Sequence, residues 1–323
     1  MKGLLYYNLQ LLQNYSAVAI GDDMENMRKN KVKTGRDTTI MNIIIVIVIG
    51  GFCILCLIPF IMMIGSSFET EYNLAHYGYT FWPRKFSLSA YELILKDGQI
   101  LQAYKVTIFM TVIGTFLSML MTMMMAYPLS LGKLKGNTFL TFFVYFTMLF
   151  GGGLVPTYLL ISKYLHMRNS IWVLILPVMF SAWNMFLMRN FFKGVPVELA
   201  ESAYVDGAND LQILYKIILP VSVPGIATIS LFYALGYWNQ WYNAMLYIDD
   251  SKLYPLQYYI MNILRYTESF KLMAMYTSVN STELPTTSIK MATTVVTIGP
   301  IVFIYPFVQK YFTSGLTVGA IKG

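Results

Sequence analysis

The sequence predicts an all-α, polytopic membrane protein with six transmembrane helices and one short helix on the cytoplasmic side. Hydrophobic residues make up 56% of the 323 residues and charged residues 12%, against about 25% charged in an ordinary soluble domain. Six stretches reach the length of about 20 mostly apolar residues that a helix needs to cross a bilayer. None of them contains Asp, Glu, Lys or Arg, so the sequence leaves no room for a large soluble domain.

The six predicted spans follow in chain order: Ile40–Ile64, Val106–Leu131, Phe139–Ser162, Ile171–Met188, Ile217–Ile248 and Met291–Gln309. Residues 43–49 are all Ile or Val, whereas the strands of a membrane β-barrel would alternate apolar and polar residues. The glycine triplet 151–153 predicts either a close helix approach or a break in the third span. Pro220 and Pro224 predict a kink where the fifth span begins.

Orientation follows from a basic cluster before the first span, formed by Arg28, Lys29, Lys31, Lys33 and Arg36. The positive-inside rule keeps such a cluster in the cytoplasm, and six spans then place both termini there. The net charge of +7 fits this orientation and anionic lipid headgroups. Without a soluble basic face it does not indicate nucleic-acid binding.

The expected organisation is a cytoplasmic tail over 1–37, a membrane domain over 38–312 and a second cytoplasmic tail over 313–323. Residues 1–22 faintly resemble a signal peptide, but Asn and Gln interrupt their apolar run, so we expect an uncleaved tail. Between the spans we expect only loops. The outer ones lie at about 65–105, 163–169 and 249–290, and the inner ones at about 132–136 and 189–216.

The spans contain no ionisable residue with which to drive transport. Proton-coupled and ion-coupled carriers usually place Asp, Glu, His or Arg inside the membrane. A transporter built on this chain is therefore expected to take its energy from another protein. His76 and His166 are isolated, and no catalytic group of residues is visible, so we expect neither an enzyme nor a bound metal or cofactor.

A polar segment, residues 189–220, separates two apolar spans and is called here the inner handle. Pro196 suits the first turn of a helix, where its missing N–H is not needed. Glu198 and Glu201 place negative charge near the positive end of that helix. Asp206 and Gly207 predict a turn or the end of the helix.

The spacing of Ala200, Ala203 and Gly207 predicts a face of small residues on this helix. Glu198 and Glu201 lie beside that face, where another protein could approach closely and pair with their carboxylates. A generic amphipathic loop with capping acids is an equally good interpretation of these residues alone.

Three parts of the handle, Glu201-Ser202-Ala203, Gly207 and Ile217-x-Leu219-Pro220, resemble the E-A-A-x-x-x-G-x9-I-x-L-P signature of permease subunits in binding-protein-dependent ABC importers. Residues 188–208 further resemble the MalG-like carbohydrate group, and residues 150–160, 236–244 and 309–323 are similar to its LplC/YtcP branch. The resemblance covers residues 40–323. Ser202 stands at the second alanine of the signature, and Val106 where such permeases often carry Asn.

The resemblance implies a type I ABC importer in a bacterial cytoplasmic membrane. This chain would form half of the translocation pathway with a second, LplB-like permease, and would work with two copies of a cytoplasmic ABC ATPase and an extracytoplasmic solute-binding protein. The partner ATPase would use ATP and Mg, and the inner handle would be the coupling helix. The expected coupling residues are Glu198, Glu201, Ser202, Ala203, Asp206, Gly207, Ile217, Leu219 and Pro220.

The same resemblance implies an oligosaccharide cargo, including fragments of acidic polysaccharides. Sugars bind by aromatic stacking and by hydrogen bonds to amides, and the candidate pathway residues of these types are Tyr145, Trp183, Asn184, Trp238, Asn239, Trp241 and Asn243. Trp238 and Trp241, three residues apart in a predicted helix, are expected to share a face. The rings could instead only pack helices together. A secondary carrier or channel that works alone is the alternative function.

Overall fold

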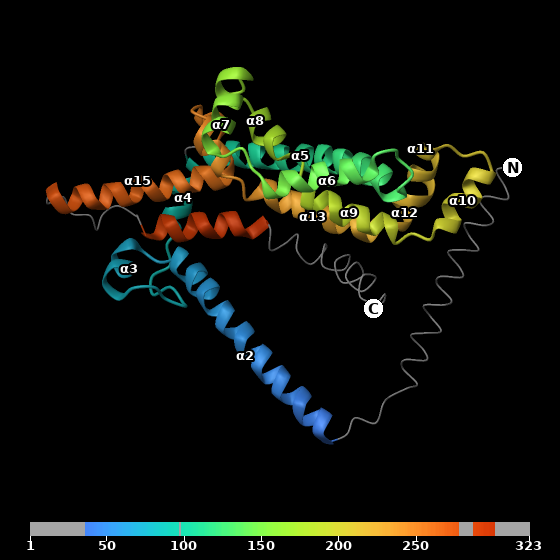
Figure 1. Cartoon of the computed structure of the whole chain (residues 1–323). Helices are drawn as coiled ribbons and strands as arrows, with labels where there is room; N and C mark the ends of the chain where they lie inside the picture. Colours follow the sequence, from blue (N-terminus) through green and yellow to red (C-terminus); the bar gives the residue numbers. More distant parts are fainter. Residues whose placement is uncertain (1–35, 97, 278–286, 301–323) are drawn as a thin grey trace. The chain divides into compact units, whose positions relative to one another are not determined.

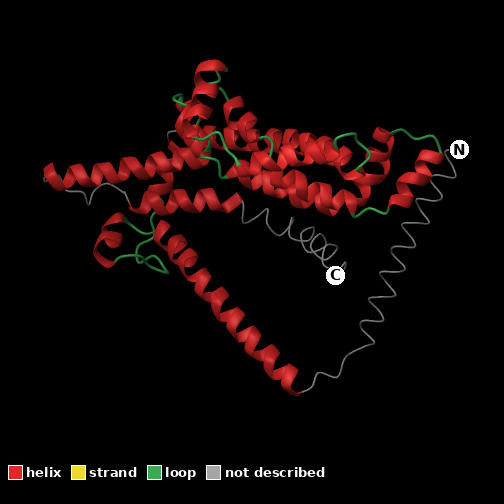
Figure 2. Cartoon of the chain, viewed as in Figure 1, coloured by secondary structure: helices red, strands yellow, loops and turns green. Residues whose placement is uncertain are grey.

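The computed structural model describes residues 36–96, 98–277 and 287–300. All regular elements in these ranges are helices (Figure 2), and the β contact found among them is an isolated bridge between Glu69 and Phe86. This confirms the expected all-α fold. The chain divides into two compact units between Ile61 and Met62, and each is described by itself.

The described part of the first unit is a single helix. Helix α2, Arg36–Ser67, contains the whole of the first predicted span and continues a few residues into the second unit (Figure 1). In its most apolar stretch of 18 residues, none is buried inside the chain. A helix that is apolar on all sides requires lipid or protein around it, so α2 has the properties of a membrane-crossing helix.

The second unit is built around helix α5, Gln99–Leu131, which contains the second predicted span. It packs against α9, Ala182–Lys193, and α13, Val223–Trp238 (Figure 1). These three helices contribute about half of the buried residues of the main hydrophobic core. They position both the inner handle and the candidate pathway.

Small side chains let α5 and α13 approach closely. Gly114, Ser118, Thr122 and Ala126 recur every four residues on the buried side of α5, a pattern that permits close contact between membrane helices. A Cβ atom added to Gly114 would lie 2.5 Å from the ring of Tyr237 on α13. The absence of a side chain at Gly114 is therefore what makes room for this tyrosine.

The third predicted span is a pair of helices with a sharp break. Helix α6, Asn137–Leu149, is followed by α7, Leu154–Leu159, and the π-helical turn η1, Leu160–Tyr164. The axis turns by 104° at the glycine triplet, where Gly153 has a φ of 82° that other residues rarely adopt. Of the two expectations for these glycines, the break is the one observed.

The fourth predicted span is also bent. Helix α8, Trp172–Ile175, continues through the 3-10 turn η2, Leu176–Val178, and meets α9 at an angle of 56°. Met179 to Ser181 separate the two parts. This break borders the candidate pathway described below.

The fifth predicted span, Ile217–Ile248, is not one continuous helix. Helix α11, Asp210–Ile213, continues through η3, Leu214–Ile218, into α12, Leu219–Val221, and this part meets α13 at 84° at Ser222. Helix α13 ends at Trp238, and α14, Tyr242–Tyr247, follows separately. Pro220 and Pro224 lack the N–H groups that a straight helix needs here, so the expected kink is observed as a sharp break.

The outer segment 249–290, predicted as a loop, contains regular structure. After the 3-10 turn η4, Ser251–Leu253, helix α15 runs over Leu256–Thr277. Leu256 and Ile260 are buried and Leu264 packs beside them, an apolar stripe at a spacing of four. Helix α15 was not predicted because its polar residues exclude it as a membrane span. The apolar stripe nevertheless indicates a helix with one buried face.

Two helices of the described ranges can cross a membrane alone, and five spans result if each bent pair counts as one. Of the sixth predicted span, Met291–Gln309, the first ten residues are helical and the rest lie outside the described residues. Apart from Arg36 and Asp37, both predicted cytoplasmic tails lie outside them as well.

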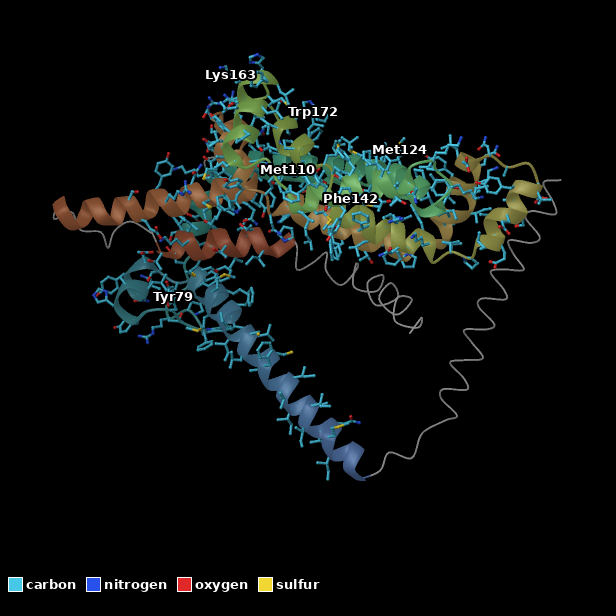
Figure 3. The ribbon with its side chains drawn as sticks, in the orientation of Figure 1. Tyr79, Met110, Met124, Phe142, Lys163 and Trp172 are labelled. Atoms are coloured by element: carbon cyan, nitrogen blue, oxygen red, sulfur yellow. The ribbon has the colours of Figure 1, made fainter. Side chains whose placement is uncertain are left out.

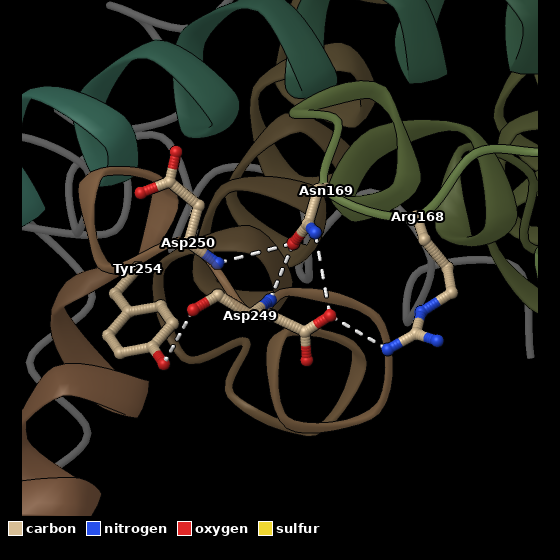
Figure 4. A network of polar contacts seen from close by, with 5 residues as sticks. All are labelled: Arg168, Asn169, Asp249, Asp250 and Tyr254. Atoms are coloured by element: carbon tan, nitrogen blue, oxygen red, sulfur yellow. Dashed lines mark hydrogen bonds and ion pairs between the residues drawn. The ribbon is translucent and has the colours of Figure 1, made fainter.

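Five residues, two from the segment before α8 and three from the segment before α15, hold these two distant segments together (Figure 4). Asn169 has a φ of 52°, and its Oδ1 accepts hydrogen bonds from the backbone N–H groups of Asp249 and Asp250 at 2.6 and 3.2 Å. Arg168 pairs with the Asp249 carboxylate at 2.7 Å, and the Tyr254 hydroxyl donates to the Asp249 carbonyl at 3.3 Å. The segment before α8 is thus held to the segment before α15.

The outer segment predicted as a loop over about 65–105 also contains helices, namely α3, Glu71–Tyr77, α4, Ser89–Lys96, and the start of α5. Glu69 organises the part of this segment between α2 and α4. It is 1% exposed, and its carboxylate accepts hydrogen bonds from Asn73 Nδ2 at 2.8 Å and from the backbone N–H groups of Thr70, Arg84 and Lys85 at 2.9, 2.5 and 3.2 Å. Burial by itself raises the pKa of Glu69, but these hydrogen bonds outweigh burial and hold the pKa below its usual value of 4.5. The charged carboxylate therefore holds the two ends of the segment 70–85 together through these hydrogen bonds.

Glu69→Ala is expected to loosen this loop, at a cost of about 3 kcal/mol in local stability, because the N–H groups of Arg84 and Lys85 would lose their acceptor in a buried site. Since the folded pKa is lowered, the stabilisation is complete above pH 4.5 and is lost as the pH falls through the folded value. Hydrogen exchange of residues 70–88 against pH measures both effects. Glu69→Gln should remove the acid dependence, and the exposed Glu92→Gln on α4 should leave it intact.

Candidate functional site

The helix of the inner handle, α10, spans Val197–Val205. Pro196 occupies the position just before the helix, one residue earlier than the first turn expected for it. The helix ends at Val205, and the chain turns at Gly207, whose φ is 81°. There the Gly207 N–H donates to the Tyr204 carbonyl at 3.0 Å and the Ala208 N–H to the Ala203 carbonyl at 2.9 Å, the pair of bonds that closes a Schellman motif.

The small-residue face of α10 does not point outward, and that expectation is corrected. Ala200 is 6% exposed, and Ala203 packs against the hydrophobic core of the same chain. Ala200 and Ala203 therefore face the chain's own core and are unavailable to a partner, whereas Gly207, the third residue of the predicted face, is exposed.

The opposite face of α10 is the one a partner could reach, and we call it the acidic face. Its exposed members, which recur at helical spacing, are Val197, Glu198, Glu201, Ser202 and Val205. Among the described residues, none forms an ion pair with either glutamate. Val205 is 89% exposed, whereas the Ser202 hydroxyl turns back to the Leu199 carbonyl at 3.1 Å. An exposed valine beside two carboxylates fits a partner surface that combines an apolar pocket with basic groups.

The second half of the signature anchors the handle. Asn209 and Gln212 form a capping box at the start of α11, with N–H to side-chain oxygen distances of 2.9 and 3.1 Å. Ile217 and Leu219 pack against the core, while Asp206 and Pro220 are exposed. The signature thus spans two parts of the handle joined by the turn at Gly207. Helix α10 has a face exposed to partners, and the segment that carries Ile217 and Leu219 packs against the core.

The predicted pathway residues are not gathered in one place. Trp238 is the last residue of α13 and is 7% exposed, packed among residues that include Leu256 and Ile260. Trp241 lies outside any helix and packs against the main core instead. The expectation that these two rings share a helix face is therefore wrong, because the helix is interrupted at Asn239 and Gln240.

The amides of the predicted set are either bonded within the chain or partly to fully buried. Asn239 is exposed, but its Nδ2 donates to the Leu235 carbonyl at 2.9 Å and its Oδ1 accepts from Gln257 at 3.4 Å. Asn184 is 7% exposed and Asn243 half-buried. They are poorly placed to bind a sugar in this conformation.

Tyr145 and Trp183 are the predicted pathway residues whose rings lie open, with 46% and 60% of their surface exposed. Trp183 borders a hollow of about 630 Å³ whose lining also includes Met125, Thr147, Phe180 and Ser181. Tyr145 borders a second hollow of about 360 Å³ with Phe142, labelled in Figure 3, and Arg189. Both hollows lie along α6 and α9, and the larger one opens at the break before α9.

Two tyrosines that sequence reasoning missed hold this break. The Tyr233 hydroxyl accepts from the Ser181 N–H at 3.2 Å and lies 2.7 Å from Thr122 Oγ1. The Tyr237 hydroxyl donates to the Ile175 carbonyl at 3.2 Å and lies 2.9 Å from Ser118 Oγ. A broken helix at membrane depth must satisfy its freed backbone groups inside the protein.

A signal for this network was present in the sequence. Tyr233 and Tyr237 are four residues apart in an otherwise apolar stretch, as are Ser118 and Thr122. Two matching polar pairs at helical spacing indicate two helices that bond to each other.

The chain is similar to known proteins over a stretch that includes the inner handle and the two hollows. Residues 100–318 match the model of a family described as binding-protein-dependent transport system inner membrane component. The chain is 42% identical over 272 residues to the polygalacturonan/rhamnogalacturonan transport system permease protein YtcP of Bacillus subtilis, spanning 84% of this chain and 94% of that protein. It is 37% identical over 299 residues to the protein LplC of the same organism, spanning 91% and 98%.

A solved structure is similar over most of the chain. It is the crystal structure of a bacterial ABC transporter involved in the import of the acidic polysaccharide alginate. The likeness has a TM-score of 0.75 at 31% identity and covers 86% of this chain and 98% of that one. Such a score at this identity extends the likeness from the sequence to the arrangement of the helices.

Proposed function

The chain belongs to the binding-protein-dependent transport system inner membrane components, and from this premise we propose a cargo and a working assembly for it. It is the permease subunit of a carbohydrate ABC importer with the type I fold, and a separate ATPase hydrolyses the ATP. This decides against the alternative of a carrier or channel that works alone. It also explains why the spans carry no charge for ion coupling.

The proposed cargo is an oligosaccharide that contains uronic acids. It is supported by the names of two relatives: one transports polygalacturonan and rhamnogalacturonan, and the other takes part in the import of acidic alginate. A less similar relative, 26% identical, transports arabinooligosaccharides. The open ring of Trp183 beside the hollow at the α9 break offers a stacking surface for such a sugar as it passes.

The proposed assembly pairs this chain with a second permease, two copies of the ATPase and an extracytoplasmic solute-binding protein. Both termini and the inner handle would lie in the cytoplasm, as the basic cluster before α2 predicts. The acidic face of α10 carries the coupling proposal, because its exposed Val205, Glu198 and Glu201 have no described partner in this chain. That face would sit in a cleft of one ATPase copy.

Alternating access would then follow from movement of α10. When ATP closes the two ATPase copies, each carries its bound coupling helix with it. Because the handle is packed into the core through Ile217 and Leu219, the displacement would reach α5 and α13. The break before α9, held by Tyr233 and Tyr237, lies against these two helices and would change its exposure to either side.

The cargo proposal is tested with the complete transporter in proteoliposomes, by measuring solute-stimulated ATPase activity and uptake over a panel of oligosaccharides. Uronate oligomers are expected to stimulate several-fold more than the same oligomers after reduction of their carboxyl groups to alcohols, which keeps size and linkage constant. Equal stimulation by the reduced oligomers would overturn the acidic cargo while leaving the coupling role intact. In the same assay, Trp183→Ala should slow uptake, and the exposed loop variant Trp82→Ala should not.

A further inference from the structure

Tyr204 links α10 to two other elements. It directly precedes the exposed Val205 in α10 and is half-buried against the core. Its hydroxyl donates a hydrogen bond to the carboxylate of Asp210 on α11. Across its ring lies Lys133, in the loop after α5, with Nζ 4.8 Å from the ring centroid.

Both contacts involve a charge, which makes them stronger than neutral contacts. The hydrogen bond to Asp210, helped by burial and by the Asp210 charge, raises the pKa of Tyr204 well above its usual value of 10, so the phenol stays protonated and donates. A cation over an aromatic ring is attracted by the negative charge of the ring face. One side chain therefore holds an anion on α11 and a cation beside α5.

The end of α5 near Lys133 is also held from α9. Arg189 Nε donates to the Leu129 carbonyl at 3.0 Å, and Tyr127, buried on the last turns of α5, belongs to the same packed cluster as Tyr204. From there α5 runs to Thr122 and Ser118, which bond to the tyrosines at the break before α9. A continuous set of contacts thus connects α10 with the larger hollow.

We propose that Tyr204 is a positioning residue that transmits displacement of α10 to α5 and α11. This inference rests on the proposed coupling function. The turn at Gly207 could act as a hinge between α10 and α11. If no other contact linked α10 to α11 and α5, a displaced α10 could rotate about this hinge while α11 and α5 stayed in place. Tyr204 prevents this rotation. Its hydroxyl is bonded to Asp210, so α11 moves with α10, and its ring contacts Lys133, so the end of α5 moves as well.

The test separates ATPase binding from the yield of transport. In Tyr204→Phe the ring remains and only the hydroxyl is lost. We expect normal co-purification of the ATPase and near-normal hydrolysis, but about fivefold less sugar transported per ATP, within the range seen for residues that carry coupling. Lys133→Met and Asp210→Asn, which each remove one charged partner, should lower the same ratio.

The matched control is Tyr215→Phe, which removes a tyrosine hydroxyl from the same handle at a site that is 59% exposed. It should leave transport per ATP unchanged. An unchanged ratio in Tyr204→Phe would overturn the inference, and so would an equal loss in Tyr215→Phe. If Tyr204→Phe does not assemble, the two charge variants decide. Failure of α10 to bind an ATPase at all would instead overturn the proposed function, and co-purification shows that separately.

Discussion

A Glu201→Lys permease is expected to reach the membrane in normal amounts and to lose sugar-stimulated ATPase activity by at least about tenfold, since like charges brought together at an interface cost several kcal/mol. Glu201 is exposed and has no described partner within the chain, so reversing its charge should alter folding by no more than about 0.5 kcal/mol. The loss would therefore report on the contact with the ATPase. Co-purification of the ATPase and its activity in proteoliposomes measure it.

Two matched variants make this result interpretable. Glu201→Gln keeps the size of the side chain and should retain more activity than Glu201→Lys. Glu92→Lys makes the same charge reversal at an exposed helical glutamate of the predicted outer loop, and should change neither measurement. Wild-type coupling in Glu201→Lys would show that the acidic face of α10 is not the docking surface.

Gly207→Pro is expected to abolish coupled transport while leaving the membrane helices assembled. Gly207 has a φ of 81°, whereas proline holds φ near −65°. Proline would also remove the N–H group that donates to the Tyr204 carbonyl at 3.0 Å. The end of α10 would then have to re-form, which would misplace both the acidic face and Tyr204.

A graded series at this position separates backbone conformation from side-chain size. A Cβ atom added to Gly207 would meet nothing within 4 Å, so any loss in Gly207→Ala comes from backbone strain, about 1–2 kcal/mol for a left-handed residue. Gly207→Asn should lose less, because Asn tolerates this conformation best among the other residues. Uptake should fall in the order Gly, Asn, Ala, Pro. A different order would mean that the left-handed turn is not what coupling requires.

The large-scale features could be predicted because local sequence carries them. Runs without charge predicted helical spans, and α2 and α5 bear this out. Pro220 and Pro224 indicated a kink, and Gly207 a turn, because these residues restrict or free the backbone wherever they stand. The family resemblance rested on a signature that includes Gly207 and Pro220, and it is confirmed by the match over residues 100–318.

The candidate site could be predicted only in part, because burial and pairing depend on residues far away in sequence. Ala200 and Ala203 have the spacing of a face, but nothing local shows whether that face meets a partner or the chain's own core. Trp238 and Trp241 have helical spacing, yet the helix between them breaks. Which aromatic rings stay open was decided by how α6, α9 and α13 pack.

By itself, the sequence determined that this chain is a helical membrane protein with a short polar helix between apolar segments, because hydropathy, glycine and proline act over a few residues. Its signature residues indicated the permease family, which the comparisons confirm. Only the tertiary structure decided which side of α10 is exposed, where the fifth predicted span bends by 84°, and how Tyr204, Tyr233 and Tyr237 connect separate helices. Two of those contacts, Tyr233 with Thr122 and Tyr237 with Ser118, join residues more than a hundred positions apart in the sequence. Their energies depend on three-dimensional proximity, which local patterns do not contain.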